Sequence, residues 1–181
     1  MPAQDQVELD SLLKILEDLS PRIVLEIGVF QGGMERVVYD RCGGDLFVGI
    51  ERNSLDSVES KKNLHGVPFV AVPFDSHEQS TLDKVKSTLD GKLVDFLFID
   101  GDHTFKGVSK DFEMYAPLVR EGGMIGFHDI NDNKKYLNSI NVFDVECHEF
   151  WKSIEGKYQT KVISNGGYLG IGLIMDWKGF K

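Results

Sequence analysis

The stretch from Ile23 to Gly33 reads I-V-L-E-I-G-V-F-Q-G-G, and it decides the fold. Four of its first five residues are apolar, which predicts a buried strand that breaks at Gly28. Two more glycines, beginning with Gly32, come directly before a helical pattern. A strand, a glycine turn and a helix start let backbone approach a ligand without interference from a Cβ atom. The stretch therefore predicts a ligand-binding turn.

Two residues of this turn indicate the chemistry of the ligand. Phe30 stands where the dinucleotide fingerprint G-x-G-x-x-G has its second glycine, which disfavours NAD. Glu26 places a carboxylate at the turn, and an acid suits a cationic amino-acid ligand better than a pyrophosphate. S-adenosylmethionine (SAM) carries ammonium and sulfonium charges. We therefore expect SAM as the cofactor, with Glu26, Gly28 and Gly32 among the residues that bind it.

Composition narrows the class of protein. The chain has 181 residues, of which 41% are hydrophobic and 27% charged, as expected of one globular domain over 1–181. A net charge of −9 argues against binding to a nucleic-acid backbone. No apolar run approaches membrane-spanning length, and the first residues lack the pattern of a secretory signal. Cys42 and Cys147 form no metal or disulfide pattern, so we expect free thiols and a cytoplasmic protein.

Strands and helices alternate along the chain. The strands are expected at Ile23–Ile27, Asp45–Ile50, Val67–Val72, Leu93–Ile99, Gly123–Phe127, Lys161–Ser164 and Leu169–Met175. The helices are expected at Val7–Leu19 (within an N-terminal helical segment 1–20), Gly32–Arg41, Ser54–Leu64, Ser80–Leu89, Lys106–Val119 and Val145–Glu155. A capping box, Ser80 to Asp83, supports one helix start. This order predicts an α/β, Rossmann-like, doubly wound and mostly parallel sheet with helices on both faces.

Polar residues follow the expected strands at the edge where such sheets bind ligands. Glu51 ends a strand 23 positions beyond Gly28, near the spacing at which a carboxylate accepts both ribose hydroxyls. Asp75 and Ser76 follow the next strand and are expected to receive the adenine amine. The segment from Asp100 to His103 follows the fourth expected strand, and His128 and Asp129 follow the fifth. Acids or histidine at five consecutive strand ends predict a site.

The segment Asp95–Ile130 contains F-I-D-G-D-H, Y-x-P-L-V-R-x-G-G and F-H-D-I. These motifs resemble class I SAM-dependent methyltransferases, in the branch of small sugar and natural-product O-methyltransferases and cephalosporin-hydroxylase-like proteins. The resemblance extends over about Ile23–Met175. It implies a seven-stranded sheet with an antiparallel last strand and methyl transfer to a hydroxyl group of a small molecule. The polar segment 130–144 is then expected to be the variable substrate loop.

The resemblance also implies catalytic residues. Related metal-dependent O-methyltransferases carry acids that match Asp100, with His128 and Asp129, so these three are the candidate ligands of a Mg²⁺ ion. Such an ion would lower the pKa of the acceptor hydroxyl. His128 departs from the catechol-type pattern, in which an Asp is usual. His103 stands where relatives carry a Lys or His base, and imidazole suits proton removal near neutral pH. Asp100 is expected to contact the cofactor as well.

Two other classes stay open. A hydroxylase-like member of the fold would need an iron-type site, which Asp100, His103 and His128 could form. A non-catalytic SAM-binding module is the second, although it has no need to retain the strand-end acids. The segments expected to choose the acceptor are short, so the pocket could be open or completed by a second subunit in a homo-oligomer.

Overall fold

The computed structural model describes residues 5–132, 145–167 and 169–180. These residues form one sheet of seven strands in the order β3-β2-β1-β4-β5-β7-β6. The strands are β1 Ile23–Ile27, β2 Leu46–Ile50, β3 Phe69–Val72, β4 Val94–Ile99, β5 Val119–His128, β6 Thr160–Ile163 and β7 Ile171–Ile174. Pairing is parallel from β3 to β5, while β7 runs antiparallel to both of its neighbours. The expected mostly parallel sheet with an antiparallel last strand is confirmed.

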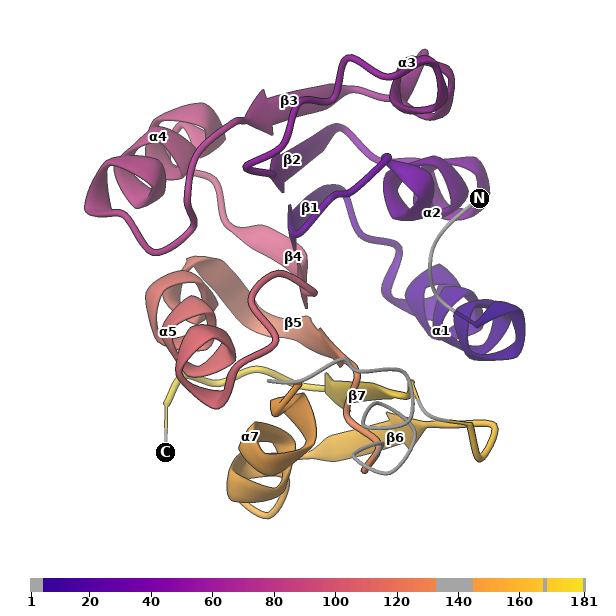
Figure 1. Ribbon diagram of the computed structural model, residues 1–181, viewed down its shortest axis with the longest axis vertical. Coiled ribbons are helices and arrows are strands. Elements are labelled where there is room, and N and C mark those ends of the chain that lie inside the picture. The colour runs from indigo at the N-terminus through magenta and orange to yellow at the C-terminus, as the bar shows by residue number, and fades with distance from the viewer. Residues whose placement is uncertain (1–4, 133–144, 168, 181) are drawn as a thin grey trace.

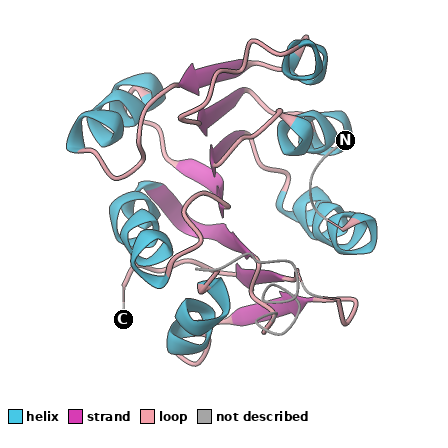
Figure 2. Cartoon of the chain, in the orientation of Figure 1, coloured by secondary structure: helices cyan, strands magenta, loops and turns pink. Residues whose placement is uncertain are grey.

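Helices cover both faces of the sheet, as expected. The helices are α1 Gln6–Leu19, α2 Gly33–Cys42, α3 Val58–Leu64, α4 Gln79–Leu89, α5 Phe105–Tyr115 and α7 Cys147–Ile154, with a short 3-10 turn at Ala116–Leu118. Figure 1 shows α1, α2 and α3 on one face and α4, α5 and α7 on the other. Figure 2 shows the same sandwich of a central sheet between two helical layers.

The two-sided burial follows from the alternation of side chains along each strand. On β1, Leu25 and Ile27 pack into the core with α4, α5 and α7, whereas Val24 packs into the core with α1 and α2. All five residues of β1 are buried. A strand covered on both faces reads as an apolar run, and this is why the sequence identified it.

Some boundaries differ from expectation. The capping box at Ser80 does not cap a helix, because α4 already begins at Gln79 and Glu78 is its N-cap residue. Helix α3 begins at Val58, where the Ser57 side chain accepts a hydrogen bond from the Ser60 amide, so the helix is shorter than expected. Most of the expected substrate loop lies outside the described residues, at 133–144. No helix in the described ranges is both long and apolar enough to cross a membrane.

The strand order places the ligand-binding edge. The chain runs outward from β1 through β2 to β3, and then returns to place β4 on the other side of β1. The connections on either side of the β1–β4 boundary therefore diverge and leave a crevice at the carboxyl ends of these strands. The carboxyl end of β1 is followed by Gly28, and that of β4 by Asp100.

Candidate active site

A cavity of about 480 Å³ opens at the carboxyl ends of the parallel strands. This volume is in the usual range for small-molecule sites. The cavity brings together most of the residues that the sequence singled out, since its wall includes Gly28, Glu51, Asp75, Ser76, Asp100, His103, His128 and Asp129. These residues come from the ends of five different strands, and only the parallel register of the sheet makes them neighbours.

Two expected cofactor residues are not part of the cavity wall. Glu26 is 3% exposed, and its carboxyl lies beside the buried carboxyl of Glu35 on α2. Burial, together with the neighbouring Glu35 carboxyl, raises the pKa of Glu26 well above its usual range. Gly32 is the N-cap of α2, and a Cβ atom there would lie 2.6 Å from the side chain of Leu64. The structure therefore places Glu26 and Gly32 in the packing behind the turn.

Glu51 ties the loops after β1 and β2 together. One carboxylate oxygen accepts the Phe30 amide at 2.8 Å, and the other accepts the amide of Asn53 at 2.8 Å and its side-chain nitrogen at 2.9 Å. Phe30 has a left-handed backbone with φ +53°, and the residue is 63% exposed. A left-handed aromatic residue is unusual, and such strain concentrates at functional sites. The carboxylate thus fixes the wall of the cavity that it also lines.

At the end of the cavity away from Glu51, Asp100 is hydrogen-bonded to two histidines. Its Oδ1 lies 3.2 Å from Nε2 of His103 and 3.2 Å from Nδ1 of His128. Burial would raise the pKa of Asp100, but the charge of His128 and the hydrogen bonds from both imidazoles outweigh it and hold the pKa at about 2. The hydrogen bond to Asp100 raises the pKa of His103 in turn. Asp100 is therefore an ionised carboxylate that orients two histidines.

Asp129 completes this group. It has a left-handed backbone with φ +58°, and its Oδ2 lies 3.8 Å from Nδ1 of His103. Its Oδ1 is buried and accepts no hydrogen bond from the described residues. Asp100, His103 and Asp129 can offer ligand atoms that all lie within 4.8 Å of one another. A buried carboxylate oxygen without a donor, facing a second carboxylate and an imidazole, is a donor set that fits a divalent cation.

His128 lies behind this set. It is 6% exposed, and its Nδ1 lies 3.6 Å from Asp129 as well as near Asp100. Burial lowers the pKa of His128, but the two carboxylates outweigh burial and raise it to about 9. Its Nδ1 faces the two carboxylates, and its Nε2 is buried without a hydrogen-bond partner among the described residues. The group that could hold a metal among the described residues thus contains His103 in place of the expected His128.

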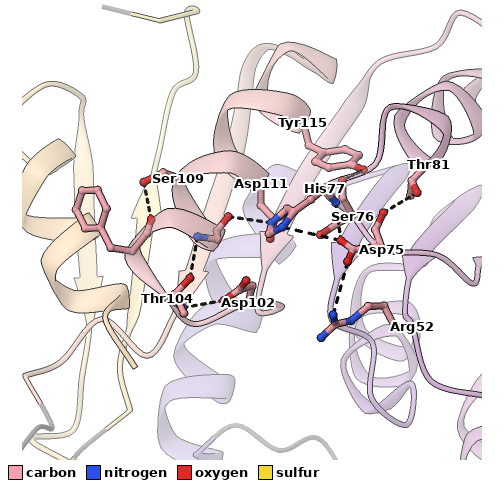
Figure 3. A network of polar contacts seen from close by, with 12 residues as sticks. Arg52, Asp75, Ser76, His77, Thr81, Asp102, Thr104, Ser109, Asp111 and Tyr115 are labelled. Carbon is pink, nitrogen blue, oxygen red and sulfur yellow. Dashed lines mark hydrogen bonds and ion pairs between the residues drawn. The ribbon is translucent and has the colours of Figure 1, made fainter. Parts of the chain in front are cut away.

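The turn after β3 has partners that sequence reasoning missed (Figure 3). His77, which follows Ser76, lines the cavity and contacts the fully buried Asp111 of α5, with Nε2 and Oδ1 3.3 Å apart. Burial raises the pKa of Asp111 to about 6, against the opposing effects of Ser76 and His77. Arg52 lies 3.6 Å from the carboxylate of Asp75 at the rim. The available signal was Asp111 itself, an acid within the apolar stripe of a helix.

A family model of a methyltransferase domain matches residues 25–130, which is more than half of the chain. The chain belongs to this methyltransferase family. The matched range begins in β1 and ends two residues after β5, so it contains the glycine turn, Asp100, His103 and Asp129. Methyltransferase membership accords with the motifs in Asp95–Ile130.

The following proteins are distantly similar to this methyltransferase. An uncharacterized protein of Acanthamoeba polyphaga mimivirus, R132, is 30% identical over 138 residues, a match that covers 70% of this chain and 62% of the viral protein. An O-methyltransferase from Bacillus cereus, solved in complex with SAH, superposes with a TM-score of 0.68 at 18% identity and covers 97% of this chain and 84% of its own. The O-methyltransferase TomG from Streptomyces achromogenes, solved with SAM, superposes with a TM-score of 0.69 at 18% identity. The match covers 96% of this chain and 81% of TomG. At such identities the two structures establish the fold.

Proposed function

We propose that this methyltransferase binds SAM in the cavity and transfers the methyl group to a hydroxyl of a small molecule. The observation that carries the proposal is the position of His103, held 3.2 Å from Asp100, in the same cavity that Glu51 lines. One end of the cavity thus offers a proton acceptor, and the other offers a carboxylate for a sugar. The B. cereus protein and TomG, whose structures contain SAH and SAM, support the cofactor and the reaction.

The strand order suggests how the cofactor lies. From β3 to β2, β1 and β4, the strand ends present Asp75 and Ser76, then Glu51, then Gly28, and finally Asp100. In our proposal the nucleobase lies at Asp75 and Ser76, and the ribose hydroxyls lie at Glu51. The amino-acid part of the cofactor lies over the glycine turn. The sulfonium then lies near Asp100, whose ionised carboxylate favours positive charge.

The chemistry needs little from the chain beyond alignment and a base. When bound, SAM would supply an activated methyl group on a sulfonium for transfer to the acceptor oxygen, with SAH as the leaving group. His103 takes the proton of the acceptor hydroxyl, and Asp100 stabilises the imidazolium that forms. Holding donor and acceptor in line contributes most of the rate enhancement.

A metal ion is an addition to this scheme. Asp100 and Asp129 would hold a divalent cation, with His103 as a third ligand if it is not the base. The ion would supply Lewis acidity that lowers the pKa of the acceptor hydroxyl. The mixed set of two carboxylates and one imidazole suits Mn²⁺ or Fe²⁺ at least as well as Mg²⁺. The iron-type hydroxylase site is less well supported, because it needs both His103 and His128 as ligands.

Labelled SAM tests the proposal directly. The protein is incubated with methyl-labelled SAM and a pool of hydroxylated metabolites, and labelled products are separated. We expect base-stable methyl ethers of a hydroxylated acceptor. In parallel, SAH binding is measured by calorimetry for the wild type and for Glu51→Ala, which we expect to bind about 5- to 150-fold more weakly, the equivalent of about 1–3 kcal/mol.

The exposed Glu121 provides a control, because it lies at the opposite end of the sheet, and Glu121→Ala should leave SAH affinity unchanged. Absence of SAH binding at millimolar concentration would overturn the cofactor assignment. Oxygen consumption that depends on Fe²⁺ without methyl transfer would favour the hydroxylase-like alternative instead. Binding of SAH without turnover of any acceptor would favour a non-catalytic module.

A further inference from the structure

Glu146, the N-cap residue of α7, holds the loop that carries His103. Its backbone amide donates a 2.7 Å hydrogen bond to the carbonyl of His103, and its carboxylate accepts a 2.8 Å hydrogen bond from the amide of Phe105. The thiol of Cys147 also lies 3.6 Å from the His103 carbonyl. The backbone at His103 and the backbone two residues later are therefore fixed by the same residue of another element.

The position of Glu146 accounts for an acid there. Phe105 is the first residue of α5, so its amide has no acceptor within the helix. The carboxylate thus lies at the start of both α5 and α7, where the helix dipoles favour a negative charge. The two helices lie side by side (Figure 1), and the rings of Phe105 and Phe150 pack edge to face with centroids 6.1 Å apart. Glu146 therefore joins the starts of two helices that are packed together.

The imidazole of His103 depends on its backbone for a fixed position. Its side chain is 36% exposed, and its ring nitrogens lie 3.2 Å from Asp100 and 3.8 Å from Asp129. Asp102 accepts a 2.9 Å hydrogen bond from the Thr104 amide, which orders the turn from within (Figure 3). Such a local bond shapes the turn but does not attach it to the helix on the other side.

We propose that Glu146 is a positioning residue that holds the loop around His103 and thereby aligns the imidazole with the methyl acceptor. The inference rests on the proposed function, because it requires His103 to take part in methyl transfer. Glu146 is not part of the cavity wall, so its effect on the reaction passes through His103. A displacement of about 1 Å at a reacting group can cost about a hundredfold in rate, so a contact outside the cavity is enough to matter.

The test measures two quantities for the wild type, Glu146→Ala and Glu146→Gln: SAH affinity, and single-turnover transfer of label from SAM to the pool of hydroxylated metabolites. We expect Glu146→Ala to slow transfer about 10- to 100-fold, the usual loss for a residue that orients a functional group, with SAH affinity unchanged. Glu146→Gln keeps an oxygen that can accept from the Phe105 amide, so it should retain most of the rate. Glu146→Asp, whose shorter side chain withdraws that oxygen, should lose rate as Glu146→Ala does and replaces it if the latter fails to fold.

A double substitution separates positioning from an independent role. If Glu146 acts through His103, adding Glu146→Ala to His103→Ala should slow the remaining transfer less than about twofold. Effects of two independent residues would instead multiply.

Ser57→Ala is the matched structural control. Ser57 likewise accepts a first-turn amide, at the start of α3, and it is not part of the cavity wall. Its loss should lower the Tm by about 2–4 °C and leave both the transfer rate and SAH affinity unchanged. A wild-type rate in Glu146→Ala, or losses that multiply in the double variant, would overturn the inference while leaving the proposed function intact. Absence of transfer by the wild type would instead overturn the proposed function.

Discussion

Gly28 and Asp100 touch backbone to backbone: a Cβ atom at Gly28 would lie 2.1 Å from the carbonyl oxygen of Asp100. The contact is held from both sides, since the Asp100 amide donates to the carbonyl of Ile27 and the Gly28 amide donates to that of Ile50, each at 2.9 Å. The glycine turn and the strand-end acid are therefore parts of one unit. The glycine is needed for this close approach as much as for its backbone conformation, φ +91°.

Replacing Gly28 by Ala should disrupt the site. The new methyl group overlaps the Asp100 carbonyl, so β1 and β4 must separate at the cavity, and SAH binding should fall at least about a hundredfold. Gly43→Ala is the matched control, because Gly43 also has positive φ, +70°, but a Cβ atom there would have no neighbouring atom within 4 Å. That control should lose only the stability that its glycine-specific backbone conformation costs an alanine, about 1–3 kcal/mol. Equal effects of the two changes on SAH affinity would contradict the close-contact argument.

His103→Ala should slow methyl transfer about 10²–10⁴-fold and leave SAH affinity unchanged, because it removes a base beside the acceptor. The raised pKa of His103 has a further consequence. The acidic limb of the wild-type rate should lie above the ordinary histidine value of about 6.5, and it should vanish in the variant. Single-turnover rates across pH measure both effects. The exposed His65 supplies the control, and a rate in His103→Ala equal to that of His65→Ala would exclude His103 as the base.

Chelation separates the metal-assisted reaction from the metal-free one. If Asp100 and Asp129 hold a divalent cation, excess EDTA should abolish turnover, and added Mn²⁺ or Mg²⁺ should restore it with little change in SAH affinity. Asp129→Asn should then raise the metal concentration needed for half-maximal activity at least about tenfold, since one carboxylate ligand is lost. Full turnover in excess chelator would show that methyl transfer needs no metal ion.

The buried pair Glu26–Glu35 should make stability depend on pH. Burial raises the pKa of both carboxyls above their unfolded value. Each therefore contributes stability that is fully present below the unfolded pKa, near 4.5, and is lost as pH rises through the folded pKa. Glu35→Gln cannot ionise, so its Tm relative to the wild type should increase as pH is raised from 4 to 8.

Glu17 should make stability depend on pH in the direction opposite to the Glu26–Glu35 pair. The hydrogen bond from Arg41 lowers the pKa of the exposed Glu17, so its small contribution is present at neutral pH and lost on acidification. Thermal denaturation of Glu35→Gln and Glu17→Gln across pH should give trends of opposite sign. A Tm difference for Glu35→Gln that does not change with pH would show that the pair does not titrate between the folded and unfolded states.

The sequence identified what depends on local pattern. The bounds of β1 were predicted correctly, because an apolar run closed by a glycine has few alternative structures. The cavity-lining acids at Glu51, Asp75 and Asp100 were also identified, because parallel strands bring their carboxyl ends to one edge. The helix start predicted from the capping box at Ser80 was wrong, because tertiary contacts easily outweigh a local signal of this kind. In the structure the Thr81 hydroxyl instead donates to the carbonyl of Asp75.

Only the tertiary structure decided which side chains face one another. It placed Glu26 against Glu35, behind the cavity, although both residues border the glycine turn in sequence. It joined His77 to Asp111, which is 34 positions away along the chain. Spacing within a strand or helix specifies a face, but the partner on the opposing element depends on sheet register and helix packing. Those depend on contacts between distant parts of the chain, and a local pattern does not contain them.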